Sequence, residues 1–136
     1  MRGSCFGTHS DCVLRMDGPE INQRARRFAC RIVQLYQKLQ KAGGAAREVA
    51  PQLLRAGTSI GANLEEATAG QTKPDFITKV CISLKESREA VFWLRVIHES
   101  RLLPDDDIEP DIREAREFVA MLTATVKRAR TSPNRG

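Results

Sequence analysis

The stretch from Leu53 to Leu64 constrains the fold of this chain more than any other. Apolar or small residues recur there at steps of four, three and four, the period of one buried helical face: Leu53, Gly57, Ile60 and Leu64. Gly57 and Gly61 lie in this segment, although glycine in a helix interior costs about 1 kcal/mol relative to alanine. The two glycines therefore predict a groove in which a neighbouring helix approaches closely.

The same helical period recurs in three other segments, and no segment has the alternation of a strand. The predicted helices run from Pro19 to about Lys41, from Ala45 to about Ala69, from Asp75 to Ser100, and from the acidic residues after Pro104 to about Arg130. Short connections between amphipathic helices favour antiparallel neighbours. The sequence therefore predicts an all-α fold, an antiparallel up-down-up-down four-helix bundle over residues 19–130.

Both ends of the chain lack this period. We interpret residues 1–18 as a disordered leader, with Met16 as an alternative start, because the opening MRGS resembles a vector-derived leader. Residues 131–136 are predicted to be a frayed tail. No apolar run approaches the roughly 20 residues that span a bilayer, and the cysteines form no CxxC pair. A cytoplasmic protein without a membrane partner is expected.

The third predicted helix is apolar on two sides. One stripe suits the bundle core: Phe76, Val80, Leu84, Val91 and Leu94. A second stripe, at a different angle around the helix, contains Ile82, Trp93 and Val96. A helix in a monomeric four-helix bundle buries one side only, so the second stripe predicts the interface of a homo-oligomer.

The first predicted helix carries a cluster of basic residues in its first half: Arg24, Arg26, Arg27 and Arg31. The helix dipole favours acidic residues at that end, so the cluster gains nothing from the dipole. Phosphates of RNA or DNA would explain it, and the formal net charge of +5 is compatible with such a partner. Phe28, Phe76, Phe92 and Phe118 lie on or beside apolar faces, so stacking on bases is not expected.

A polar row follows the apolar face of the second predicted helix at steps of four and three: Ser59, Asn63 and Glu66. Asn63 and Glu66 could reach a neighbouring helix. Alternatively the row is solvated, or Ser59 bonds its own backbone.

Residues for enzyme chemistry are scarce. The histidines are His9, in the predicted leader, and His98, interpreted as an ordinary residue at a helix end, so neither a metal site nor a histidine-based triad is predicted. No phosphate-binding glycine loop occurs, and no cofactor is expected. Glu66 and Lys85 are the candidates for an enzyme, but no pair of nucleophile and base can be named.

Three strings carry a family resemblance: RARRFACRIVQLYQKL, QLLRAGTSIGANLEEA and DFITKVCISLKESREAVFWLR, between Arg24 and Arg95. They resemble the bacterial four-helix-bundle family named for the protein encoded in intervening sequences of 23S ribosomal RNA genes. Ala56 and Ser83 depart from it, because serine and alanine respectively are usual there. The resemblance places these residues at recurrent motif positions: Gly57, Ser59, Gly61, Asn63, Glu66, Lys85, Glu86, Glu89 and Trp93.

The resemblance also implies partners. Family members are homo-oligomers, with pentameric barrels known, and a related branch is the accessory protein of diversity-generating retroelements, which binds nucleic acid and a reverse transcriptase. The leading hypothesis is therefore a non-enzymatic, homo-oligomeric nucleic-acid-binding accessory factor. The alternative is a protein-interaction scaffold with no nucleic-acid ligand, in which the basic residues serve solubility.

Overall fold

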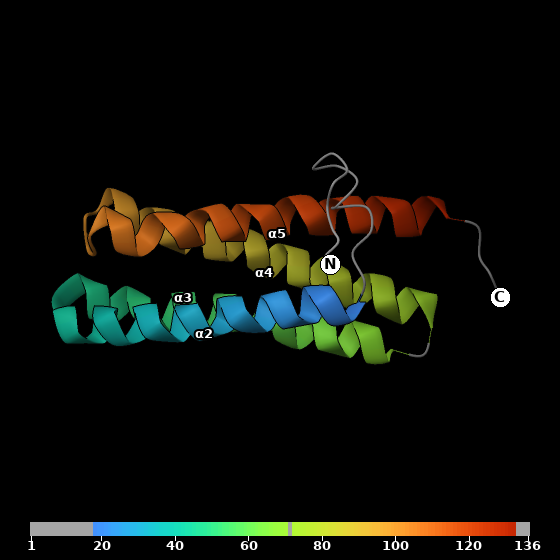
Figure 1. Ribbon diagram of the computed structural model, residues 1–136, viewed down its shortest axis with the longest axis horizontal. Coiled ribbons are helices and arrows are strands. Elements are labelled where there is room, and N and C mark those ends of the chain that lie inside the picture. Colours follow the sequence, from blue (N-terminus) through green and yellow to red (C-terminus); the bar gives the residue numbers. More distant parts are fainter. Residues whose placement is uncertain (1–17, 71, 133–136) are drawn as a thin grey trace, which may run out of the picture.

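The computed structural model describes residues 18–70 and 72–132, and it confirms the predicted all-α four-helix bundle (Figure 1). Its helices are α2 (Gly18–Ala42), α3 (Gly44–Ala69), α4 (Lys73–Glu99) and α5 (Asp105–Thr131). Residues 1–17 of the leader predicted over 1–18, and residues 133–136 of the tail predicted over 131–136, lie outside the described residues. Of the residues assigned to those two segments, Gly18 begins α2 and Thr131 ends α5.

Local sequence explains where the helices begin and end. Gly43 and Gly44 both have positive φ, 72° and 56°, which lets the chain reverse in one step between α2 and α3. The hydroxyl of Thr72 accepts a hydrogen bond from the backbone N–H of Asp75 at 3.2 Å and caps α4. The first turn of α5 contains three aspartates, which the positive end of the helix dipole favours.

Pro51 lies in the interior of α3, yet the helix continues through it. A proline cannot donate the hydrogen bond to the carbonyl four residues earlier, here that of Arg47. The side-chain amide of Gln40, on α2, donates to this carbonyl at 3.4 Å instead. The proline is therefore tolerated because a neighbouring helix supplies the missing donor.

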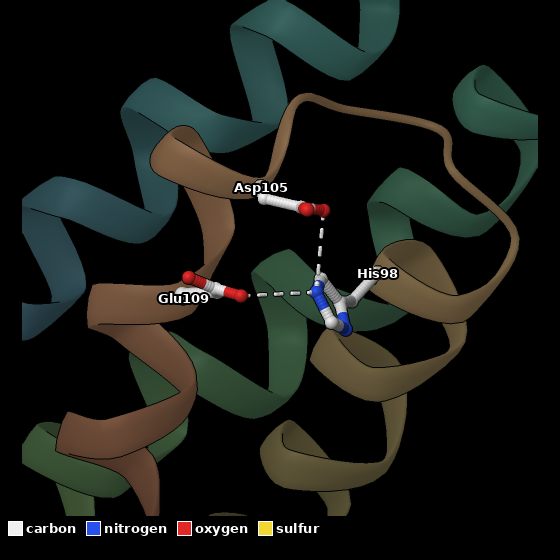
Figure 2. A group of neighbouring side chains, drawn as sticks. All are labelled: His98, Asp105 and Glu109. Atoms are coloured by element: carbon white, nitrogen blue, oxygen red, sulfur yellow. Dashed lines mark ion pairs between the residues drawn. The ribbon is translucent and has the colours of Figure 1, made fainter.

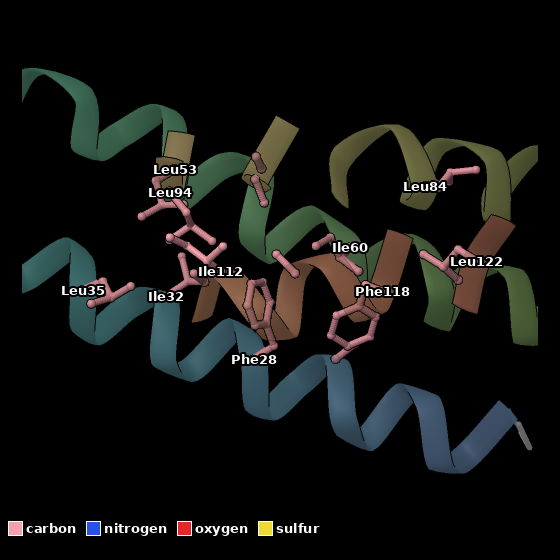
Figure 3. Close-up of a cluster of buried hydrophobic side chains, with 14 of the residues drawn as sticks. Phe28, Ile32, Leu35, Leu53, Ile60, Leu84, Leu94, Ile112, Phe118 and Leu122 are labelled. Carbon is pink, nitrogen blue, oxygen red and sulfur yellow. The ribbon is translucent and has the colours of Figure 1, made fainter. Parts of the chain in front are cut away.

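Apolar side chains from all four helices fill the centre of the bundle (Figure 3). The rings of Phe28 and Phe118 pack against each other with centroids 5.6 Å apart. Between α3 and α4 the interface includes small residues, and the buried hydroxyl of Ser83 donates to the carbonyl of Ile60 at 2.9 Å. The departure from the family pattern at Ser83 thus adds a buried cross-helix hydrogen bond.

Gly57 and Gly61 lie against α2. A Cβ atom on Gly57 would approach Cγ1 of the buried Ile32 to 2.7 Å, well inside van der Waals contact. A Cβ atom on Gly61 would lie 3.4 Å from that of Ala25, an ordinary contact distance. The groove predicted from the glycines is thus filled by α2, and Gly57 is its tightest point.

The helices follow one another around the bundle, so α2 lies diagonally opposite α4. The helices that are consecutive in the chain pack closely, whereas α2 and α5 approach each other less closely. Long side chains bridge this looser seam. Within the described residues, no helix combines the length and the apolar character needed to cross a bilayer.

Candidate functional site

The α2–α5 seam is crossed by a ladder of three ion pairs, and two of the four predicted nucleic-acid-binding arginines belong to it. Arg24 forms two bonds to the carboxylate of Glu114, at 2.7 and 2.9 Å. Arg31 Nε lies 2.6 Å from Oδ1 of the buried Asp111, and Lys38 Nζ lies 3.2 Å from Oδ1 of Asp107. Because the α2 members are spaced by seven residues, they share one helix face.

The Arg24–Glu114 pair is electrostatically coupled. Burial is the largest single influence on Glu114 and favours its neutral form, but the hydrogen bond and charge of Arg24, with the charges of Arg31 and Arg27, outweigh it. The pKa of Glu114 therefore lies below its ordinary value. The hydrogen bond to Glu114 likewise raises the pKa of Arg24 above its ordinary value, although burial opposes this.

The other two arginines of the predicted cluster do not belong to the three ion pairs of this ladder. Arg26 pairs with Glu65 of α3 at 2.9 Å, and both side chains are largely exposed. Arg27 is exposed. The carboxylates of α5 thus explain why Arg24 and Arg31 lie in the first half of α2, and Arg26 and Arg27 are the members of the cluster most accessible to a ligand.

The three residues of the polar row on α3 make two kinds of contact. The hydroxyl of Ser59 donates to the backbone carbonyl of Arg55 at 2.6 Å. The side-chain amide of Asn63 donates to the backbone carbonyl of Ser59 at 2.8 Å. Glu66 reaches α4, where it pairs with Lys79 at 2.6 Å. Of the alternatives left open by the sequence, Ser59 and Asn63 bond their own helix, and Glu66 makes the cross-helix contact.

The motif residues on α4 near Glu86 and Glu89 tie α4 to α3. Arg55 of α3 forms ion pairs with both carboxylates. The indole N–H of Trp93 donates to Glu89 at 3.2 Å, and the ring packs against the core cluster. Trp93 is therefore partly buried within one chain, and it is not freely available on the second stripe.

Phe92 is the most exposed large apolar side chain on α4, with 56% of its surface accessible. It lies almost opposite the core-facing residues of the helix, between Arg88 and Arg95 in the sequence. Ile82 and Val96, predicted as interface residues, are half-buried beside this outer face. The sequence reasoning missed Phe92 because it lies next to Val91 and Trp93 and was counted with the apolar faces.

A shallow depression runs along this outer face of α4. Its lining combines apolar and charged side chains: Arg88, Val91, Phe92, Arg95, Val96 and Glu99. Phe92 packs edge-on against Trp93, with ring centroids 5.0 Å apart. We call this surface the Phe92 face.

The α4–α5 turn brings together three side chains that the sequence reasoning did not connect. Arg101 adopts a left-handed conformation, with φ of 56°, and the N–H groups of Arg101 and Leu102 bond the carbonyls of His98 and Ile97 at 3.1 and 3.0 Å. These two bonds define a Schellman motif, which reverses the chain directly after α4. Figure 2 shows the result, with the His98 ring facing both Asp105 and Glu109 of α5.

Comparison with known proteins gives one consistent result. The family model described as 23S rRNA-intervening sequence protein matches residues 19–124. A crystal structure from Bacteroides thetaiotaomicron, described as a protein of unknown function from the S23 ribosomal protein family, is 32% identical. The similarity covers 82% of this chain and 99% of that one, with a TM-score of 0.74. Among curated proteins, no match is found.

Proposed function

The chain belongs to the family of 23S rRNA-intervening sequence proteins, and from this premise we propose that it is a non-enzymatic, homo-oligomeric accessory factor that binds nucleic acid. In this proposal the subunits associate through α4, and α2 supplies the basic surface. The main observation behind this proposal is the exposed side chain of Phe92 on α4, which supports self-association.

Self-association is supported by the chemistry of the Phe92 face. Burying a phenylalanine side chain stabilises an assembly by about 1.5 to 3 kcal/mol, and the ring is otherwise exposed to water. Arginines and aromatic residues are enriched at protein interfaces, and this face combines both. Ile82 and Val96 would extend the contact, whereas Trp93 would support Phe92 from beneath.

The arrangement of the helices supports a division between the two surfaces. Because α2 lies diagonally opposite α4, an assembly formed through α4 leaves the outer side of α2 facing solvent. Each subunit would then present Arg26 and Arg27, next to the half-exposed Arg24 and Arg31. Repetition of this surface in a ring, such as a pentamer, would give a positive field stronger than that of one chain.

A non-enzymatic role is supported by ion pairs that engage carboxylates of α3 and α4. The carboxylate of Glu66, considered above together with Lys85, pairs with Lys79 at 2.6 Å. Glu86 and Glu89 are engaged by Arg55.

The test of self-association compares Phe92→Glu with Val33→Glu. Val33 is the other exposed large apolar residue among those described, at 40%, and it lies on α2. Light scattering should give the wild type and Val33→Glu a mass several times the 15.2 kDa of one chain, and Phe92→Glu the mass of a monomer. A monomeric wild type, or equal masses for all three, would contradict the proposal.

The test of nucleic-acid binding uses Arg26→Gln combined with Arg27→Gln, since neither change breaks the ion-pair ladder. Arg113→Gln combined with Lys127→Gln removes the same charge from exposed positions on α5 and is the control. Titration of labelled structured RNA and of a DNA duplex should show weaker binding for the α2 variant, with the salt slope lower by about 1 per lost phosphate contact.

The control should bind nearly as tightly as the wild type. If the control and the α2 variant bind equally, the binding surface is not α2. If the wild type binds neither probe at low salt, the interaction scaffold without a nucleic-acid ligand replaces the proposal.

A further inference from the structure

We propose that His98, Asp105 and Glu109 form a binding site for a divalent transition-metal ion, with Zn²⁺ as the expected occupant. The site lies at the α4–α5 turn, and its three residues belong neither to the lining of the Phe92 face nor to the basic residues of α2. It is independent of the proposed function, because neither self-association nor nucleic-acid binding uses these three side chains.

The distances suit a small metal ion. Nε2 of His98 lies 3.3 Å from Oδ1 of Asp105 and 3.5 Å from Oε2 of Glu109, and one ligand atom from each of the three residues lies within 4.8 Å of the others. Zinc binds histidine nitrogen and carboxylate oxygen at about 2.0 to 2.2 Å, which places tetrahedral ligand atoms roughly 3.3 to 3.6 Å apart. The two histidine–carboxylate distances already match this spacing.

The fold fixes the relative positions of the ligands. The Schellman motif at Arg101 ends α4 at Glu99, one residue after His98, and returns the chain to Pro104, so that α5 starts beside the imidazole. Asp105 and Glu109 are four residues apart on α5 and therefore lie on the same face, one turn above the other. The backbone thus places the three residues close to one another at this turn.

The surroundings leave room for the remaining ligands. Asp105 and Glu109 are largely exposed and His98 is about one-third exposed, so water can complete the coordination shell. Nitrogen and carboxylate donors without a thiolate suit Zn²⁺ and its neighbours in the first transition series better than Mg²⁺ or Ca²⁺. His98 and Glu109 also line a depression with Arg95, Arg113 and Arg116, whose charges oppose a cation and limit its affinity.

A competing explanation is that the three residues form only an ion-pair cluster. In that case a proton occupies Nε2 and satisfies both carboxylates. Zinc requires the neutral imidazole, so it takes the place of that proton, and its binding weakens as the pH is lowered. Direct titration with the metal therefore separates the two explanations.

The experiment is a calorimetric titration of the full chain with Zn²⁺ alone, in a buffer that does not chelate metals. We expect one ion per chain with a micromolar dissociation constant. His98→Gln, Asp105→Asn and Glu109→Gln should each weaken binding by at least about tenfold, as removal of a ligand does more than removal of its supporting contacts. Circular dichroism checks that each variant stays helical.

Two controls isolate the site. Asp106→Asn removes the same charge from the same first turn of α5, next to a proposed ligand, and should leave the affinity unchanged. The chain also contains His9 and four cysteines, which bind zinc in their own right. If zinc binds at His98, Asp105 and Glu109 and not at those side chains, His9→Gln has no effect, and the Co²⁺-loaded protein shows no charge-transfer band from thiolate sulfur.

The proposal is overturned if zinc does not saturate the wild type below millimolar concentration. It is also overturned if binding survives His98→Gln, or if Asp106→Asn weakens binding as much as Asp105→Asn does. A thiolate band for the cobalt protein that His98→Gln leaves unchanged would assign the metal to the cysteines.

Discussion

Gly57 and Gly61 occupy the same face of α3 but meet different neighbours on α2. Gly57 faces the branched, buried side chain of Ile32, whereas Gly61 faces the small side chain of Ala25. The two positions therefore separate the cost of a steric clash from the gain in helix propensity, because both residues are buried within one helix.

We expect Gly57→Ala to lower the free energy of unfolding by about 1 to 2 kcal/mol, since Ile32 must move and overpacking outweighs the propensity gained. Gly61→Ala should leave it unchanged or raise it by up to about 1 kcal/mol, because the added methyl fits at 3.4 Å from Ala25. Urea denaturation measures both values. Equal effects of the two changes would show that the groove has no tightest point at Gly57.

The contacts of individual side chains were the feature of this protein hardest to predict from its sequence. The spacing of Gly57 and Gly61 is enough to predict a groove, but which of them is crowded depends on Ile32 and Ala25, which belong to another helix. The exposure of Phe92 follows from its angle around α4, and that angle could have been counted from the sequence. The sequence gives no sign that Arg101 adopts a left-handed conformation, because glycine is the usual residue at that position of a Schellman motif.

At the level of the helices, the α2–α5 seam differs from the other pairs of neighbouring helices because its two helices approach each other less closely and long charged side chains bridge the gap. The guanidinium groups of Arg24 and Arg31 also lie 5.7 Å from the ring centroids of Phe118 and Phe28, so the charges cover the aromatic pair. The helices themselves were predictable from their apolar period. The ion pairs of the seam were not predictable, because Arg24 and Glu114 lie 90 residues apart in the chain and their pairing depends on the register between α2 and α5.

The lowered pKa of Glu114 predicts a specific pH dependence of stability. In the unfolded chain the pKa of a glutamate is about 4.3, and in the folded chain the pKa of Glu114 lies below that value. The stabilisation is therefore complete above the unfolded pKa and is lost as the pH falls through the folded one. Glu114→Gln should lower the free energy of unfolding by about 1 kcal/mol at neutral pH, because both partners are partly exposed to solvent.

This difference between the wild type and Glu114→Gln should shrink towards zero as the pH falls below about 4. Glu65→Gln, which removes an exposed ion pair with Arg26 between α2 and α3, is the control and should cost less than about 0.5 kcal/mol. Chemical denaturation of the three proteins across the acid range tests the expectation. A Glu114→Gln effect that stays constant with pH would exclude the charge as its source.

For the whole molecule, self-association through the Phe92 face predicts that stability depends on protein concentration. Unfolding of an oligomer releases separate chains, so dilution favours the unfolded state. The midpoint of thermal unfolding should fall by a few degrees for each tenfold dilution of the wild type, and it should not change for Phe92→Glu. Differential scanning fluorimetry over a hundredfold range measures this, and a constant midpoint for the wild type would count against the assembly.

The bundle also has two distinct poles. The turns after α2 and α4 lie at one pole, and Gly18 and Thr131 lie at the other (Figure 1). At that second pole, Lys73 donates to the carbonyl of Ser132 at 2.7 Å and Asn22 to the hydroxyl of Thr68 at 3.1 Å. A circular permutant that joins residue 132 to residue 18 and opens the chain between Gly43 and Gly44 would therefore keep all four helices continuous, because both changes fall at helix ends.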